Sequence, residues 1–362
     1  MALILTFLGK GGSGRSTCAI AAAKKLSAQG KRVLLITEDA GPGFSLLLGN
    51  TLSSQPEAMD TNLWVMQLQY AQLLEQNWEQ LKKLEAQYLR DPFFKDVYGQ
   101  ELSLLPGMDQ ALTLNALREF DGCGDYDVIV HDGPGNQASL RMWGMPAGID
   151  WYFRRFKQVF QASQFSKAIM PFVQPVAGAV LSGGLAGDLF DHPELQQGSG
   201  LIEQGVAAVK NPMRVRAYLV SSGDEVAIAT ARYLWGAAQQ IEMTVAGIFL
   251  NRGTQKPEEF EQLPVHILPA VTDDWQPLLT AMPDYLEKFS APAPVEVDLS
   301  SSTVRLFLPS FDKKQIQLTQ YGPEVTIEAG DQRRNLTLPT SLKGRSVTGA
   351  KFQSGYLILS FS

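Results

Sequence analysis

Short, uninterrupted apolar runs recur along roughly the first 270 residues and alternate with longer stretches rich in alanine, leucine and charged side chains. Runs of this length without polar alternation are typical of strands buried on both faces, as in a parallel sheet covered by helices. The predicted strands are Leu3–Leu8, Val33–Thr37, 126–132, 216–220, 244–250 and 265–269. Strands that alternate with helical stretches predict an α/β fold with a doubly wound, mostly parallel sheet.

Helical periodicity marks the stretches between these strands. In residues 60–91, apolar side chains recur at three- and four-residue intervals opposite a face of glutamine and glutamate. Helices are predicted over residues 18–29, 60–91 and 224–240, and a helical region rich in methionine and phenylalanine over 146–190. Helical insertions into the sheet are therefore expected near residues 60–120 and 146–210.

The pattern changes at residues 291–294, where Ala-Pro-Ala-Pro cannot continue a helix and predicts a short semi-rigid linker. After it, apolar and polar residues alternate in short segments separated by turn residues, which is typical of antiparallel strands. The predicted strands are 295–299, 303–308, 315–320, 324–328, 333–338, 346–352 and 356–361. We therefore expect one domain over residues 1–290 and a small all-β sandwich over residues 295–362.

Composition narrows the class of protein. With 362 residues, 45% of them apolar and 19% charged, the chain has the make-up of a soluble globular protein of about two domains. The net charge of −6 argues against a nucleic-acid-binding surface, which needs clustered positive charge. The two cysteines, Cys18 and Cys123, indicate no disulfide framework. The histidines are interpreted as structural: His131, His192 and His266.

No basic, apolar leader with a cleavage site opens the sequence. The most apolar stretch, residues 169–190, is interrupted by glycines, Pro175 and Asp188, and this makes it a poor membrane-spanning helix. A cytoplasmic protein is therefore expected.

The segment between the first predicted strand and the first predicted helix carries the strongest chemical signal. Gly9 and Gly14 have the spacing of a phosphate-binding loop, in which a basic and a hydroxyl residue follow the second glycine. Glycine is needed because backbone N–H groups must close around phosphate oxygens, and the following helix points its positive end at the same anion. Arg15 stands where the motif has lysine, and Lys10 adds a second basic side chain. The alternative is a glycine-rich turn without a ligand.

Lys10, followed by Gly-Gly-Ser-Gly-Arg-Ser-Thr, resembles the deviant Walker A loop of one class of ATPases. The class includes arsenite-pump ATPases, tail-anchored-protein targeting ATPases, septum-site and partition ATPases, and nitrogenase iron protein. Two segments are similar to the switches of the arsenite-pump and tail-anchored-targeting branch: residues 38–45 (the first switch segment) and 132–141 (the second switch segment). The residues that match the branch's switch patterns are Asp39, Ser45, Asp132, Leu140 and Arg141. The resemblance covers about residues 1–290 and implies the fold of a P-loop NTPase.

The same resemblance implies a site for ATP and Mg²⁺ and assigns roles to single residues. The residues that would enclose the phosphates are Gly11, Gly12, Ser13, Gly14, Arg15, Ser16 and Thr17. Ser16 would hold Mg²⁺, and Asp132 would hold a water molecule on that ion. Lys10 would reach the partner's nucleotide across a homodimer, Asp39 would position the attacking water, and Asn251 would contact adenine. From the residues alone, the alternative for Asp132 is a strand-end cap, and Asn251 can equally be a turn residue.

Arginine at position 15 changes the expected activity. Its guanidinium is planar and forked, whereas lysine carries a compact charge, so we expect nucleotide binding to survive and hydrolysis to be slow. The expected function is a weak ATPase with Lys10, Asp39 and Arg15 as catalytic residues. The alternative is a non-hydrolysing nucleotide-binding scaffold or a chaperone-like interaction protein.

In the targeting ATPases that the chain resembles, the nucleotide cycle is coupled to a hydrophobic client. Here Met142, Met145, Met170 and the phenylalanines within 153–172 are candidates for a client groove, although aromatic side chains at helical spacing are more often core. The client would be a transmembrane segment or an unfolded chain, and contact with a membrane surface stays open. Arsenite is disfavoured because no set of cysteine ligands is present. The segments 325–330, 333–339 and 349–352 resemble parts of the α-crystallin domain of small heat-shock proteins. Such a domain over residues 295–362 would either handle the client or only pack.

Overall fold

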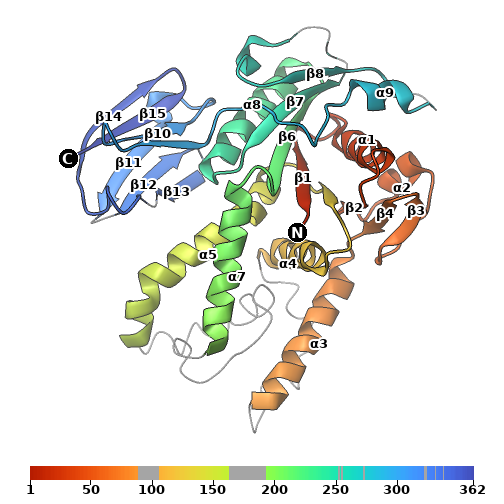
Figure 1. Cartoon of the computed structure of the whole chain (residues 1–362), viewed down its shortest axis with the longest axis horizontal. Helices are drawn as coiled ribbons and strands as arrows, with labels where there is room; N and C mark the ends of the chain where they lie inside the picture. The colour runs from red at the N-terminus through yellow and green to blue at the C-terminus, as the bar shows by residue number, and fades with distance from the viewer. Residues whose placement is uncertain are drawn as a thin grey trace.

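The computed structural model describes residues 1–88, 106–162, 193–251, 253, 256–271, 274–321, 324–330, 332–336 and 338–362. Within them, the larger sheet has eight strands in the order β3-β4-β2-β5-β1-β6-β7-β8 (Figure 1). All neighbouring pairs are parallel except the edge pair of β3 and β4. The strands are β1 (Leu3–Leu8), β2 (Val33–Thr37), β3 (Glu57–Asp60), β4 (Leu63–Gln67), β5 (Val128–Asp132), β6 (Val215–Ser221), β7 (Val245–Asn251) and β8 (Val265–Leu268). The prediction of a mostly parallel, doubly wound sheet is confirmed.

Alternate residues of the buried strands face two separate helical layers, as the two-residue period of a strand requires. In β1, Leu5 and Phe7 belong to the core on one face, and Ile4 and Leu8 to the core on the other. The first layer contains α1 (Arg15–Ala28), α2 (Pro42–Leu48) and α9 (Gln276–Ala281). The second contains α4 (Met108–Cys123), α5 (Gln137–Ala162), α7 (Pro193–Lys210) and α8 (Glu225–Gln240). Helix α3 (Tyr70–Tyr88) packs against α4, and η3 (Glu258–Phe260) and η4 (Lys313–Gln315) are single turns.

The prediction of one long helix over residues 60–91 is wrong at its start. Residues 57–67 form the hairpin of β3 and β4, whose turn contains Asn62 with a φ of 61°, and α3 begins only at Tyr70. Strand β4 pairs in parallel with β2, and this pairing buries Leu63, Val65 and Met66. Tertiary burial on the sheet therefore overrides the helical pattern in this stretch.

Four helices lie in or near the regions where helical insertions are expected. Helices α3 and α4 lie near residues 60–120, and α5 and α7 lie near 146–210, although α5 begins earlier than predicted and includes Pro146. Residues 163–192, which include Met170 and several of the predicted phenylalanines, lie outside the described residues. In the part of the chain that is described, no helix is both long and apolar enough to span a bilayer.

The carboxy-terminal residues form two antiparallel sheets around one core, as the alternating pattern predicts. One sheet has the order β14-β15-β10-β9 and the other β11-β12-β13. The strands are β9 (Val295–Asp298), β10 (Thr303–Phe307), β11 (Ile316–Tyr321), β12 (Glu324–Ala329), β13 (Gln332–Leu336), β14 (Val347–Gln353) and β15 (Tyr356–Phe361). Leu306 and Leu359 from the first sheet meet Val325 and Ile327 from the second.

This sandwich lies directly on α8 of the larger domain (Figure 1). Trp235 of α8 is edge-on to Phe307, with 5.3 Å between ring centroids, and both side chains are buried. Gly236 allows the close approach, because a Cβ there would overlap the Ser310 hydroxyl and lie 2.8 Å from Phe311. The larger sheet's helix α8 and the carboxy-terminal sandwich therefore share a packed interface, and the linker over residues 291–294 stays a prediction.

A buried ion pair strengthens the same interface. Arg334 of β13 lies 2.9 Å from Glu242, which also pairs with Lys210 at 2.9 Å. Burial lowers the pKa of the Arg334 guanidinium, and the Glu242 charge opposes this shift. Burial alone would raise the pKa of Glu242, but the charges of Arg334 and Lys210 hold it below its usual value. The pair is thus favourable only while both charges are present.

We expect Glu242→Ala to lower the free energy of unfolding by about 2 kcal/mol or more, because it leaves the Arg334 guanidinium buried without its counter-charge. Arg334→Met should cost less, since Glu242 keeps Lys210. Urea denaturation followed by tryptophan fluorescence measures both. The control is Glu296→Ala, which removes an exposed ion pair with Arg305 and should change the stability by less than about 0.5 kcal/mol. Equally small effects of the Glu242 and Glu296 variants would contradict this account of the interface.

Candidate functional site

The loop between β1 and α1 is a glycine cradle. Gly12 and Gly14 have φ angles of 80° and 98°, a left-handed conformation that glycine adopts without strain. At Gly9 a Cβ would overlap the carbonyl oxygen of Val220, and the Gly9 N–H donates to the carbonyl of Gly135 at 2.9 Å. Close contact with β6 and with the second switch segment therefore fixes the path of the loop.

The cradle has room for an anion. Apart from each glycine and its two chain neighbours, no atom of the described residues lies within 4 Å of a Cβ built at Gly11 or Gly12. Ser13 Oγ is buried and has no hydrogen-bond partner among the described residues. Ser16 and Thr17 follow in the first turn of α1. The positive end of the helix dipole faces the loop there, and no acidic side chain in this turn offsets it. These residues fit the phosphate groups of a nucleotide.

Asp132 brings a buried carboxylate to the start of α1. It is 4% exposed at the end of β5, and it accepts hydrogen bonds from Ser16 and, at 3.3 Å, from the Thr37 hydroxyl. Burial raises the pKa of Asp132, and the Ser16 hydrogen bond and the Arg15 charge oppose that rise. Hydroxyl and carboxylate oxygens are the ligands that Mg²⁺ prefers, so the pair of Ser16 and Asp132 fits the predicted magnesium site. The described residues contain no cluster of three or more His, Cys, Asp or Glu side chains placed to bind a metal.

Arg15 reaches the second switch segment. Its Nη1 donates to the carbonyl of Gly133 at 3.1 Å and also to that of Pro134. Gly135 has a φ of 64°, and a Cβ there would overlap the guanidinium. Burial lowers the pKa of Arg15, and the Asp132 charge opposes this shift. The guanidinium of Arg15, which replaces the motif's lysine, therefore donates hydrogen bonds to backbone carbonyls beside the phosphate loop.

Asp39 lies exposed in the first switch segment, where its Oδ1 accepts from the Gly41 N–H at 2.8 Å. Its own N–H donates to Thr37 Oγ1 at 3.1 Å, and Gln67 donates to its carbonyl at 2.6 Å. Thr37 thus connects Asp39 to Asp132, because the same hydroxyl bonds to both.

Lys10 is exposed on the loop, within electrostatic reach of Asp224 at the start of α8. The pKa of Asp224 is lowered first by its hydrogen bond from Ser222, then by that from the Ala227 N–H, and also by the Lys10 charge. Lys10 therefore lies on the surface of the loop, which is where a residue that acts across a dimer would have to be.

Asn251, at the end of β7, contacts the phosphate loop. Its Nδ2 donates to the Ser13 carbonyl at 3.1 Å, and a Cβ at Gly14 would lie 2.5 Å from the same nitrogen. The contact with adenine stays a prediction.

Glu38 is a candidate that the sequence motifs do not single out. It is buried at the end of β2, with its Oε1 2.7 Å from His131 Nε2. Thr113 of α4 donates to its Oε2 at 3.3 Å, and the Tyr70 hydroxyl of α3 donates to the same atom. The sequence offers one signal for this cluster. Glu38 precedes Asp39 and His131 precedes Asp132, and β2 and β5, which lead into these residues, are neighbours in the sheet. Glu38 thus joins the first switch segment to the helical insertion.

Comparison with known proteins adds the family. Residues 2–294 match the model of anion-transporting ATPases. The chain belongs to this family. Residues 300–361 match the HSP20-like domain found in ArsA, so the small sandwich is that domain. The anion-transporting ATPases bind ATP with Mg²⁺, in agreement with the cradle and the oxygen ligands described above.

Two relatives match along nearly the whole chain. The chain is 24% identical to the "Putative arsenical pump-driving ATPase" of Chlorobaculum tepidum, over 99% of this chain and 95% of that protein. It is 24% identical to protein Rv2184c of Mycobacterium tuberculosis, over 99% and 96%. An ASNA1 ATPase homologue of Cryptosporidium parvum is 26% identical over 47% of this chain and 44% of its own length.

A Glu38→Gln variant tests the buried cluster. Burial alone would raise the pKa of Glu38, but the hydrogen bond and charge of His131 and the Tyr70 hydroxyl lower it below 4.5. The ionised carboxylate therefore stabilises the fold above about pH 4.5, and this contribution is lost as the pH falls through the lowered pKa. At pH 7 the variant should lose about 2 kcal/mol of unfolding free energy, and it should show a shallower loss in acid than wild type.

Urea denaturation at pH 7 and at about pH 4 measures both effects. Glu57→Gln, at an exposed position, is the matched control and should change neither. If the Glu38 variant lost as much unfolding free energy in acid as wild type, the cluster would not hold a charged carboxylate.

Proposed function

We propose that the protein is a slowly hydrolysing Mg²⁺-ATPase that acts as a homodimer and couples its nucleotide state to a hydrophobic protein client. The observation that carries the proposal is the geometry of Arg15, whose guanidinium donates to the carbonyls of Gly133 and Pro134 beside an otherwise complete phosphate cradle. The cradle supports binding, and the engaged guanidinium supports slow turnover.

The ligand-binding roles follow from the chemistry of the residues. Backbone N–H groups of Gly11 to Thr17 would hold the phosphates, with Ser16 and Asp132 at the magnesium ion. The ion would neutralise charge on the phosphate oxygens. Asp39 would orient the attacking water, because its carboxylate is exposed and its backbone is held by Thr37.

Arg15 is the reason to expect a slow reaction. In phosphoryl transfer the positive charge must lie within a fraction of an ångström of the oxygens that gain charge. A guanidinium that bonds to the second switch segment must break these bonds before it can approach the phosphates. Lys10 is exposed and would supply the missing charge to the partner's nucleotide in a head-to-head dimer.

Two sets of hydrogen bonds would link the switch segments, and so the bound nucleotide, to the helical insertion and to the HSP20-like domain. Glu38 contacts α3 and α4 through Tyr70 and Thr113. Gln137, the first residue of α5, donates to the Tyr233 hydroxyl at 2.7 Å and accepts from Gln332 of the HSP20-like domain at 2.7 Å. Both switch segments are thus bonded to the parts of the chain that would handle a client.

The expected groove residues divide between core and surface. Met142 is 1% exposed and belongs to the core below the sheet, so it is not a groove residue. Met145 and Phe153, on the same helix, are partly exposed. The remaining candidates within 155–172 have no described side chains. The client, a transmembrane segment or an unfolded chain, is therefore a proposal from the family resemblance and from α5.

The second candidate function is a scaffold that binds nucleotide without turnover. The same bonds from Arg15 to two carbonyls favour it, because a guanidinium held there acts as a structural tie between α1 and the second switch segment.

The two candidates are separated by Arg15→Lys. We expect the lysine to raise the steady-state rate of ATP hydrolysis at least about tenfold, about 1.4 kcal/mol of barrier, because a flexible point charge can follow the phosphate. The control is Arg32→Lys, because Arg32 is exposed and pairs with Asp127 before the start of β2. Its rate of ATP hydrolysis should stay within about twofold of wild type. No hydrolysis in either the wild type or the lysine variant, together with intact ATP binding, would favour the scaffold.

Lys10→Ala tests the dimer. It should abolish hydrolysis and leave the nucleotide dissociation constant within about tenfold of wild type, because the lysine would act on the partner's phosphates. Mixing it with an Asp39→Ala variant should restore part of the activity, since each subunit would supply what the other lacks. Lys31→Ala, at the opposite end of α1, is the control. Full activity of a Lys10→Ala protein, or of a strict monomer in sedimentation, would contradict the proposal.

A further inference from the structure

The buried pair of Glu38 and His131 lies directly against the second switch segment. The two side chains are 7% and 0% exposed, and Glu38 Oε1 lies 2.7 Å from His131 Nε2. A Cβ built on Gly133 would lie 2.6 Å from Glu38 Oε1 and 2.6 Å from His131 Cε1. Real Cβ atoms do not come this close to another heavy atom, so the pair and the Gly133 backbone are packed without a gap. The pair therefore limits how closely the second switch segment approaches the first.

Gly133 transmits this contact to Arg15. The Gly133 carbonyl accepts a hydrogen bond from Arg15 Nη1 at 3.1 Å, and the same guanidinium bonds to the Pro134 carbonyl. Arg15 is the first residue of α1 and lies beside the phosphate cradle. A displacement of Gly133 would therefore move the acceptors that hold the guanidinium.

Glu38 also fixes the residue that follows it, Asp39. The Glu38 N–H donates to the Asp132 carbonyl at 3.0 Å, and the Asp39 N–H donates to Thr37 Oγ1 at 3.1 Å. The backbone on the amino-terminal side of the Asp39 carboxylate is thus bonded at two successive residues. Because the Glu38 side chain is anchored as well, the position of Asp39 depends on the buried pair.

Neighbouring elements hold the pair itself in place. His131 Nδ1 lies 3.2 Å from Thr6 Oγ1 of β1, and the imidazole is edge-on to Trp143 of α5, with 5.8 Å between ring centroids. The Tyr70 hydroxyl of α3 donates to Glu38 Oε2. These contacts leave neither side chain free to move independently of the sheet and the helices.

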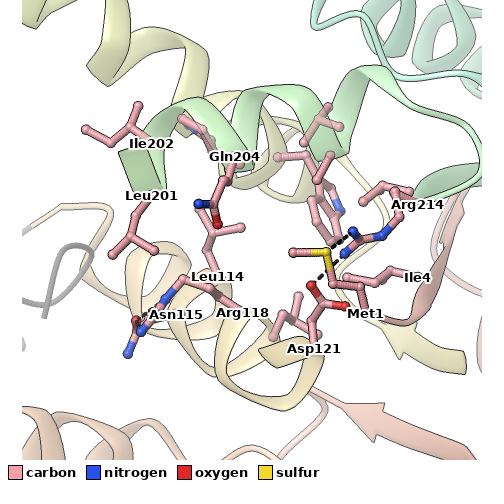
Figure 2. A pocket seen from close by; sticks show the side chains of 17 residues that line it. Met1, Ile4, Leu114, Asn115, Arg118, Asp121, Leu201, Ile202, Gln204 and Arg214 are labelled. Carbon is pink, nitrogen blue, oxygen red and sulfur yellow. Dashed lines mark hydrogen bonds and ion pairs between the residues drawn. The ribbon is translucent and has the colours of Figure 1, made fainter. Parts of the chain in front are cut away.

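Helix α4 provides a further anchor. Thr113 of α4 donates to Glu38 Oε2 at 3.3 Å. Near the end of the same helix, Asp121 pairs with Arg214 at 2.6 Å (Figure 2) and accepts from the Ala2 N–H at 2.6 Å. Because Ala2 and Arg214 immediately precede β1 and β6, α4 is bonded to the central strands of the sheet.

We propose that Glu38 and His131 are positioning residues of the nucleotide site: they fix the second switch segment, and with it the Arg15 guanidinium, relative to the Asp39 carboxylate. The inference rests on the proposed function. Both residues act through Gly133 and Asp39, and the phosphates would be held by backbone N–H groups of the cradle. Loss of the pair should therefore slow hydrolysis, which needs alignment within a fraction of an ångström, and spare nucleotide binding.

Gly133→Ala tests the contact directly, because the backbone of Gly133 lies outside the left-handed region and accepts alanine without strain of its own. The added methyl must displace the pair or the switch segment. We expect kcat for ATP to fall at least about tenfold and the calorimetric dissociation constant of Mg²⁺-ADP to stay within about threefold of wild type. The matched control is Gly122→Ala in α4, where an added Cβ meets no described neighbour within 4 Å, and it should change neither value.

A double-mutant cycle separates positioning from independent damage. Glu38→Gln should lower kcat at least about fivefold with the same unchanged ADP binding. If both substitutions act by displacing the second switch segment, the double variant should be no slower than about twofold below the slower single variant. Multiplied losses of kcat, or a kcat within twofold of wild type in either single variant, would overturn the inference.

Glu242→Ala controls for stability, because it weakens the fold at the domain interface, away from the switches. Assayed at a temperature where all variants are folded, it should keep kcat within about twofold of wild type. A loss of kcat as large as that of Glu38→Gln would assign the effect to reduced stability and contradict a positioning role.

A measurement without turnover distinguishes this inference from the proposed function. The chain has three histidines, so ¹³C-labelled histidine gives three ring Cε1–H signals, and the signal missing in His131→Gln is that of His131. Gly133→Ala should shift this signal and Gly122→Ala should not. Mg²⁺-ADP should also shift it in wild type, because the second switch segment lies against Cε1.

If wild type binds ADP but does not hydrolyse ATP, the proposed ATPase is wrong, and the His131 signal decides the positioning role. A signal that ignores both bound ADP and Gly133→Ala would overturn that role whether or not ATP is hydrolysed.

Discussion

The buried carboxylate of Asp132 is the constraint on which the site depends. A charge that is removed from water at the end of a strand is unfavourable unless neighbouring groups compensate it. Here the compensation comes from three directions: Ser16 at the start of α1, Thr37 at the end of β2, and the Arg15 charge. These contacts hold the start of α1 and the ends of β2 and β5 at fixed positions around the phosphate cradle.

The residues next to Thr37 and Asp132 face away from the phosphate site. Glu38 follows Thr37, His131 precedes Asp132, and the two form a second polar cluster against α3 and α4. Arg15 and Gln137 tie the second switch segment to α1 and to the HSP20-like domain. Each switch segment is therefore held from one side by the phosphate site and from the other by a helix or a domain. A movement of either segment on binding or release of nucleotide would have to rearrange both sides.

Much of the fold could be predicted from the sequence, because the signals are local. Buried parallel strands, the glycine spacing of the phosphate loop and the two-residue alternation of the carboxy-terminal strands depend on neighbouring residues alone. The hairpin of β3 and β4 could not, because its burial comes from β2, which lies elsewhere in the chain. The direction of the Arg15 guanidinium and the Glu38–His131 contact are set by residues about a hundred positions away. The docking of the sandwich on Gly236 likewise leaves no local trace, since α8 resembles any amphipathic helix.

The central claim is that the Asp132 site, with arginine in place of lysine, still holds a nucleotide together with Mg²⁺. Calorimetric titration of a non-hydrolysable ATP analogue, with and without Mg²⁺, measures this directly in wild type and in Asp132→Asn. The account predicts that Mg²⁺ tightens binding at least about tenfold in wild type, about 1.4 kcal/mol, and that the substitution removes this gain. Binding that is equally tight without the metal, or no binding at millimolar nucleotide, would contradict it.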